Sequence, residues 1–311
     1  MNNWEKGGYK DEKTNDVEIN PIGKKENLSV GQNKDEKNEQ QKDVDSGKLE
    51  FVREQIKYLD DDKTDEKNNK DKIEKYINQH TPEYLKKEDP STIYKFSKWV
   101  SSFFVKEIQG KDKLPEGPKL FIANHRGGES GRLIAALDNR VNISVAETIN
   151  WKRNKAFQWV LKKLGMIPIK ETFSNLSEQQ IEEVLKKSPI GQKEKHKAVA
   201  RGFNSLGGNT KNIKTMVALL LQGKDVAIFV EGPFSRLKED ERKAYAGFAL
   251  VAREYKRVAG KELNIIPTGI RKSKVSFGES FHIDKKGKQS KEELQEIATE
   301  KIHGLYDALG E

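Results

Sequence analysis

The chain has 311 residues, of which 34% are hydrophobic and 34% are charged, with a formal net charge of +9. It contains no cysteine, which excludes disulfides, thiol nucleophiles and cysteine metal sites. Its first residues are polar and no apolar run reaches about 18 residues, so we expect neither a secretory signal nor a membrane-spanning helix.

The N-terminal part is rich in charge and poor in apolar side chains. Residues 1–46 offer too little apolar surface to offset the entropy of ordering the chain, so we expect a disordered polar tail. Residues 47–88 read as a charged linker, with short amphipathic helices around Val52 and Tyr76.

Residues 89–290 alternate strand-like and helical segments, and 291–311 form a C-terminal helix. This alternation predicts an α/β domain with a mostly parallel central sheet flanked by helices. The expected strands are 120–123, 141–145, 166–169, 226–230, 265–267 and a pair within 275–283, and the expected helices are 131–137, 151–164, 213–221 and 245–255.

The helix that opens this domain has a surface suited to lipid. Ser91 or Thr92 caps it, and it is expected to continue to Ile108. Its broad aromatic face, which includes Trp99 and Phe103, is bordered by lysines, as at a membrane interface. A helix packed on the sheet would show a similar pattern.

The net positive charge favours anionic partners, either nucleic acid or an anionic lipid surface. Nucleic-acid binding would need a basic face with interleaved aromatics, whereas the lysines here are spread among carboxylates. We therefore expect a membrane lipid surface as partner, no nucleic acid, and a cytoplasmic protein bound peripherally to the inner face of the membrane.

The stretch around His125 is the leading candidate for chemistry. A short apolar strand ends at Ala123, Asn124 and His125 follow, and a glycine cluster precedes the next helix. Open α/β sheets bind ligands at strand ends of this kind, and histidine changes its charge near neutral pH. A lone histidine is more often structural, so this candidate depends on the segments downstream.

Four segments follow in order: ANHRGGES at 123–130, LGMIPIKE at 164–171, IFVEGPFSR at 228–236 and IIPTGI at 265–270. Their order and spacing resemble the glycerophospholipid acyltransferase family, the lysophosphatidic acid acyltransferases and their relatives. That family carries Asn-His followed by four residues and Asp, then Gly-x-Ile-x-Val-x-Arg, Phe-Pro-Glu-Gly-Thr-Arg-Ser and Val-Pro-Val blocks.

The resemblance implies transfer of a fatty acyl group from an acyl thioester to the hydroxyl of a lysophospholipid or related glycerolipid. Acyl-CoA or acyl carrier protein would be the co-substrate, with no other cofactor and no metal. The histidine of this family is the general base, a role typically worth about 10²–10⁴-fold in rate. The resemblance gives this role to His125.

The carboxylate that steadies the base is displaced in this chain. The family aspartate lies five positions after the histidine, where this chain has Ser130, and the nearest carboxylate is Glu129. Residues four apart share a face if the helix has already begun at His125, so we predict that Glu129 orients the imidazole of His125.

The predicted substrate-binding residues come from the same blocks. Glu231 and Gly232 match the family and would shape the acceptor side of the pocket. The family arginines that contact phosphate are displaced, and Lys170, Arg236 and Arg126 stand near their positions. We expect these three to rebuild an anion site, because guanidinium and ammonium groups bind phosphate.

Two alternatives remain open. Ser130 could be a serine hydrolase nucleophile, but the Gly-x-Ser-x-Gly pattern fails at Arg132. The displaced acid and arginines also fit a membrane-binding protein that keeps the acyltransferase fold with weakened or lost catalysis.

Overall fold

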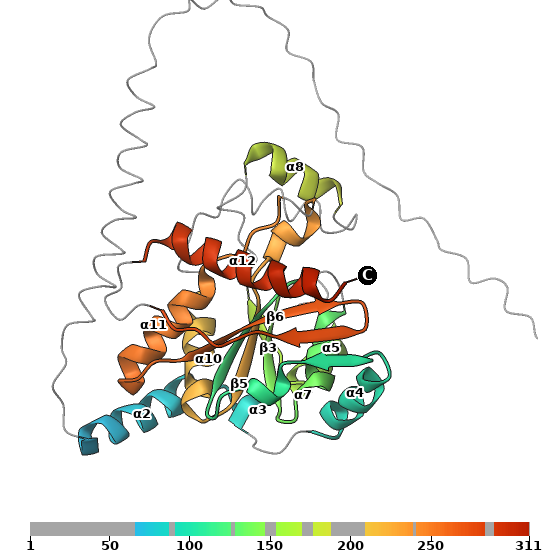
Figure 1. Cartoon of the computed structure of the whole chain (residues 1–311). Helices are drawn as coiled ribbons and strands as arrows, with labels where there is room; N and C mark the ends of the chain where they lie inside the picture. Colours follow the sequence, from blue (N-terminus) through green and yellow to red (C-terminus); the bar gives the residue numbers. More distant parts are fainter. Residues whose placement is uncertain are drawn as a thin grey trace, which may run out of the picture. The chain divides into compact units, whose positions relative to one another are not determined.

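The computed structural model describes residues 66–86, 91–125, 128–146, 154–169, 177–187, 209–238, 241–283 and 289–310 (Figure 1). All of them belong to one unit, Asp61–Glu311. The tail predicted at 1–46 and the helix predicted around Val52 lie outside the described residues.

A seven-stranded sheet runs through the described residues in the order β1-β7-β6-β2-β5-β3-β4. Five neighbouring strands from β6 to β4 are mutually parallel, whereas β7 is antiparallel to β6 and pairs in parallel with β1. The predicted mostly parallel α/β fold is confirmed. The strands are β1 (Glu107–Gln109), β2 (Lys119–Ala123), β3 (Val141–Ala146), β4 (Ile167–Ile169), β5 (Asp225–Phe229), β6 (Asn264–Arg271) and β7 (Lys274–Phe277).

Helices flank this sheet on both faces (Figure 1). The α-helices are α2 (Glu66–His80), α3 (Glu83–Lys86), α4 (Thr92–Ser102), α5 (Glu129–Ala136), α7 (Lys155–Lys163), α8 (Glu178–Lys186), α10 (Thr210–Leu221), α11 (Gly247–Ala259) and α12 (Lys291–Ala308), and the 3-10 helices are η1 (Lys111–Lys113) and η3 (Gly232–Arg236).

The central strand β2 shows how the sheet separates two cores. Side chains alternate between the faces of a strand, and all five residues of β2 are buried. Leu120 and Ile122 pack with residues of α2, α10, α11 and α12. Phe121 and Ala123 pack with residues of α4 and α5 on the other face. Burial on both faces explains why residues 120–123 of this strand form an unbroken apolar run.

The first expected helix is shorter than its sequence pattern indicated. The Oγ of Ser91 accepts a hydrogen bond from the backbone N–H of Tyr94, which confirms the predicted cap. The extension to Ile108 is wrong, because α4 ends at Ser102 and Ile108 pairs with Val275 between β1 and β7. Strand pairing therefore outweighs the apolar periodicity at this end.

The helix α2 is longer than expected and packs on the same core as α10 and α11. The Tyr76 hydroxyl donates a 2.8 Å hydrogen bond to Glu254, and the carboxylate of Glu254 also accepts two bonds from Arg257. Burial, the charge of Glu254 and this hydrogen bond together raise the pKa of Tyr76. These contacts hold α2 against α11.

Candidate active site

The carboxyl ends of β2, β5 and β6 meet at one edge of the sheet, because these strands are parallel neighbours. Asn124, which follows β2, is fully buried and binds the backbone of Ile270 twice. Its Oδ1 accepts from the Ile270 N–H at 2.7 Å, and its Nδ2 donates to the Ile270 carbonyl at 2.9 Å. On the other side, the Val230 N–H donates to the Ala123 carbonyl. The chain that leads to His125 is therefore held from both neighbouring strands.

Glu231 holds the backbone of His125 itself. Its side chain is 1% exposed, and its Oε2 accepts from the His125 N–H at 3.0 Å. Its Oε1 lies 3.3 Å from the Nε2 of His303 in α12. The buried carboxylate thus bridges the loop after β2 and the C-terminal helix.

The ring of His125 is partly open to solvent, with 45% of its side chain exposed. One side packs against the ring of Phe229, with centroids 5.1 Å apart. Its Nδ1 is buried, and the nearest carboxylate oxygen, Oε2 of Glu129, is 3.8 Å away. This separation is suited to an ion pair but is too long for a hydrogen bond. The structure therefore brings His125 and Glu129 together.

Glu129 begins α5, and its side chain is 3% exposed. The preceding Gly128 has φ 76°, a left-handed conformation that glycine adopts without strain. The positive end of the helix dipole stabilises a carboxylate in the first turn, and the Nη1 of Arg132 lies 4.0 Å from Oε1. The buried carboxylate of Glu129 therefore lies near two positive groups as well as the imidazole.

The structure describes only two of the other predicted substrate-binding residues, Gly232 and Arg236. Gly232 begins η3 with φ 47°, and a Cβ there would lie 3.3 Å from the Tyr245 ring. Arg236 ends η3 and is partly exposed. Lys170 and Arg126 lie outside the described residues.

His303 is a residue of this site that was not predicted from the sequence. The sequence feature that could have indicated it is a polar stripe in the last helix, made of Gln295, Thr299 and His303, which are spaced four residues apart. Such a stripe beside the buried residues of α12 marks a face that contacts polar groups.

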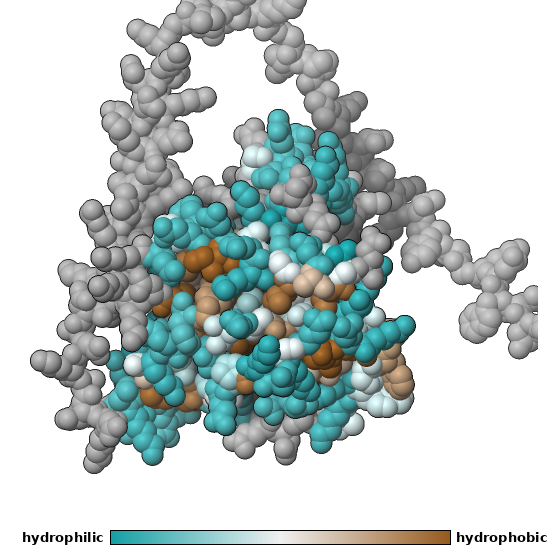
Figure 2. Space-filling view, viewed as in Figure 1, coloured by the Kyte–Doolittle hydropathy of each residue, from teal (hydrophilic) through white to brown (hydrophobic). Residues whose placement is uncertain are grey.

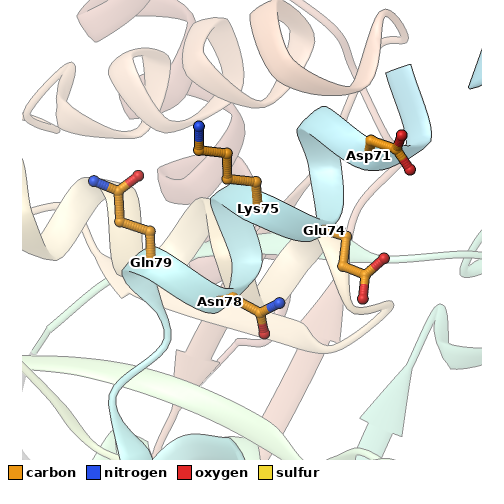
Figure 3. A pocket seen from close by; sticks show the side chains of 5 residues that line it. All are labelled: Asp71, Glu74, Lys75, Asn78 and Gln79. Carbon is orange, nitrogen blue, oxygen red and sulfur yellow. The ribbon is translucent and has the colours of Figure 1, made fainter. Parts of the chain in front are cut away.

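A separate hollow of about 670 Å³ runs along α2 (Figure 3). A fatty acyl chain needs an apolar channel, whereas every residue that lines this hollow carries a charged or an amide group. It does not include His125 or Glu129. Its lining residues are Asp71, Glu74, Lys75, Asn78 and Gln79.

Two further findings concern metals and membranes. In the part of the chain that the structure describes, no group of three or more histidine, aspartate or glutamate side chains is placed to hold a metal ion. Among the described helices, none combines the length and apolar character needed to cross a bilayer.

The fold and site define an α/β protein with a histidine and a carboxylate at the carboxyl edge of its sheet. A family model described as Acyltransferase matches residues 106–271, which is more than half of the chain. The chain therefore belongs to this family, that of the glycerophospholipid and lysophosphatidic acid acyltransferases, and the resemblance in its motifs is confirmed. This membership supports O-acyltransferase activity in general. No curated protein and no solved structure matches the chain.

Proposed function

We propose that the protein transfers a fatty acyl group from an acyl thioester, acyl-CoA or acyl carrier protein, to the hydroxyl of a lysophospholipid or related glycerolipid. The observation that carries this proposal is the pose of His125. Its Nδ1 is buried and turned toward Glu129, while 45% of the side chain stays open at the sheet edge. We assign the substrate hydroxyl to Nε2, the ring nitrogen other than the one that lies near Glu129.

In the proposed reaction, Nε2 of His125 takes the proton from the acceptor hydroxyl as the oxygen attacks the thioester carbonyl. A C–O bond forms, the tetrahedral intermediate collapses, and the C–S bond breaks. The departing thiolate then takes the proton from the imidazolium, so the base is regenerated. Glu129 stabilises the imidazolium while it carries the proton. Catalytic contacts are often long before substrate binds, which fits the 3.8 Å separation of these side chains.

The acceptor side of the pocket would be formed by the segment after β5. Glu231 and Gly232 follow this strand after one residue, Val230, and Glu231 contacts the backbone of His125. Arg236, at the end of η3, is the described candidate for the anionic group of the acceptor, and Lys170 and Arg126 are the other two candidates. A guanidinium suits this task because it binds phosphate oxygens in pairs.

We further propose that α4 and α7 dock the protein on an anionic lipid surface. Four aromatic side chains of α4 and the turn after it are 59–65% exposed: Phe96, Trp99, Phe103 and Phe104. Hydrophobic residues reach the right-hand edge of the surface in Figure 2, where Figure 1 draws α4. On α7, Phe157 and Trp159 are 41% and 54% exposed.

Lysines border these aromatics, as expected for a surface that meets anionic headgroups. Lys95, Lys106, Lys155 and Lys162 are exposed. Lys98 has a different position, because its Nζ donates to the Leu137 carbonyl at 2.6 Å and to the carbonyl of the residue after it. The exposed lysines would attract the protein to a membrane, and the aromatic rings would enter its interface.

The inner face of α4 connects this surface to the catalytic helix. The Tyr94 hydroxyl accepts from the Val141 N–H, and the Ser91 hydroxyl donates to the Lys163 carbonyl at the end of α7. A Cβ on Gly131, in α5, would lie 2.8 Å from the hydroxyl of Ser101, in α4. The helix that begins with Glu129 therefore lies directly against the proposed membrane helix, which suits an acceptor taken from a bilayer.

The enzymatic proposal is tested by product formation. The purified protein is incubated with labelled acyl-CoA or acyl carrier protein and a panel of lysophospholipids, together with a His125→Gln variant. We expect a labelled diacyl product from the wild type and a loss of about 10²–10⁴-fold in the variant. His282→Gln is the matched control, because its Nδ1 contacts the Leu263 carbonyl outside the site. Equal rates in wild type and His125→Gln would refute the mechanism.

Membrane docking has its own test. Trp99→Ser combined with Phe103→Ser should reduce flotation with vesicles that contain anionic phosphatidylglycerol. Both side chains are exposed, so the fold should be unaffected. A parallel pair, Phe157→Ser with Trp159→Ser, tests α7. Unchanged flotation of both pairs would remove this surface from the proposal.

The second candidate function is a membrane-binding protein of this fold without turnover. The observation that favours it is the displaced acid: Ser130 stands where the family has its aspartate. Its signature is vesicle binding by the wild type without any acyl product in the assay above.

A further inference from the structure

The carboxylate of Glu231 lies between two histidines that are far apart in the sequence. From these contacts we infer that His303 is a positioning residue for the proposed acyl transfer. It acts through Glu231, which holds the backbone of His125, and it contacts no substrate. This inference rests on the proposed function of His125, and the family match, which ends at residue 271, assigns nothing to α12.

Glu231 needs hydrogen-bond donors on both of its oxygens. A buried carboxylate accepts bonds only, and a buried acceptor without a donor costs free energy. The His125 N–H reaches Oε2, and the Nε2 of His303 reaches Oε1. When Nε2 carries a proton, His303 fixes the orientation of the carboxylate and so the direction from which it holds the catalytic loop.

The face of α12 that bears His303 holds the segment after β5 at two other points. The Gln295 amide donates to the Ala244 carbonyl at 3.0 Å, and the Ala244 N–H donates to the Thr299 hydroxyl at 2.9 Å. Residues four apart lie on one side of a helix, so these two side chains and His303 act from the same side. The Tyr245 N–H in turn donates to the Val230 carbonyl, directly before Glu231.

Close packing against the sheet fixes how near α12 can lie. A Cβ added to Gly269 in β6 would lie 2.8 Å from the Leu305 backbone and side chain. Figure 1 shows α12 running across the sheet beside β6. His303, two residues before Leu305, is therefore carried to Glu231 by a helix with little freedom to shift.

A pair of variants separates the donor from the rest of the side chain. Glutamine at position 303 can present an amide N–H near the place of the imidazole Nε2, whereas asparagine is one bond shorter and cannot reach Glu231. We expect His303→Gln to keep kcat within about threefold of wild type. We expect His303→Asn to lower kcat by about 10–100-fold with little change in KM, which is the usual loss when a partner that orients a site residue is removed. His282→Ala is the control, since it removes a histidine contact elsewhere, that of Nδ1 with the Leu263 carbonyl.

A second readout does not depend on activity. Hydrogen exchange of the peptide that contains the His125 amide should be faster in His303→Asn than in His303→Gln or wild type, because this amide donates to Glu231. If the wild type transfers no acyl group, the proposed function fails. The exchange measurement still tests whether His303 acts on the backbone of His125 through Glu231. Equal kcat in the two variants, or equal exchange where activity is absent, would overturn the role of His303.

Discussion

Replacing Glu129 with glutamine tests the central electrostatic claim about the site. The change keeps the shape of the side chain and removes its charge. The carboxylate and the imidazole ring are 3.8 Å apart, and the acid is buried while the ring is about half exposed. Two opposite charges at about 4 Å interact by about 4 kcal/mol at an effective dielectric of 20 and by about 1 kcal/mol in bulk water.

For a half-exposed ring, we take about 2 kcal/mol, which lies between these limits. The positive charge on the ring develops only as the transition state forms, so removal of the carboxylate charge raises the barrier by about this amount. The expected loss is about thirtyfold in kcat/KM, since about 1.4 kcal/mol corresponds to a factor of ten. Glu116→Gln, an exposed glutamate in the turn before β2, is the matched control.

The assay is acyl transfer followed in a double-mutant cycle with His125→Gln. If the acid acts through the ring, Glu129→Gln should have little further effect once the ring is gone. Wild-type kcat/KM in Glu129→Gln would refute the reasoning. A full thirtyfold loss in the His125→Gln background would show that the carboxylate acts by another route.

Three further predictions concern the structure around the site. Asn124→Ala leaves the buried N–H and C=O of Ile270 without partners, which costs about 1–3 kcal/mol for each group. Urea unfolding should therefore show that the free energy of unfolding falls by about 2–5 kcal/mol. A loss under about 1 kcal/mol would contradict the role of these two hydrogen bonds. Gly269→Ala forces a methyl group against Leu305, so we expect the free energy of unfolding to fall by about 1–3 kcal/mol in the same measurement. We also expect a reduced kcat, because α12 would shift. Unchanged values of both would show that the helix can move freely. Burial, and then the charge of Lys214, lower the pKa of His80. The folded state therefore prefers the neutral ring, and its contribution to stability is lost as the pH falls below the ordinary histidine pKa of about 6.5. Wild type should lose more stability than His80→Gln between pH 7.5 and 5, and equal losses would contradict this sign.

The sheet could be predicted from sequence because its strands carry strong local signals. The buried run at 120–123 and the apolar run at 226–230 both correspond to observed strands, β2 and β5. Gly165 and Gly223, which have positive φ, also lie just after α7 and α10, the position at which glycine commonly ends a helix. The end of α4 was missed because β1 is three exposed residues whose pairing depends on β7, a partner far along the chain.

The site was predictable only where its residues are close in sequence. His125 and Glu129 stand only four apart, so their proximity could be predicted, although His125 precedes α5 and the turn at Gly128, not a shared helix face, brings them together. The contact between Glu231 and His303 joins residues 72 positions apart, and helical periodicity cannot indicate which strand end a distant helix will reach. The contact between Asn124 and Ile270 spans 146 positions and depends on the order of strands in the sheet.

The place of β2 in the middle of the sheet has a consequence for biosynthesis. Lys119, its first residue, binds Asp225, which is translated 106 residues later, and its other neighbour, β6, is later still. Until both neighbouring strands have left the ribosome, the backbone N–H and C=O groups on both edges of this apolar strand have no strand partners. Expression at low temperature or with chaperones should therefore raise the soluble yield, and no partly translated chain should have the assembled histidine site.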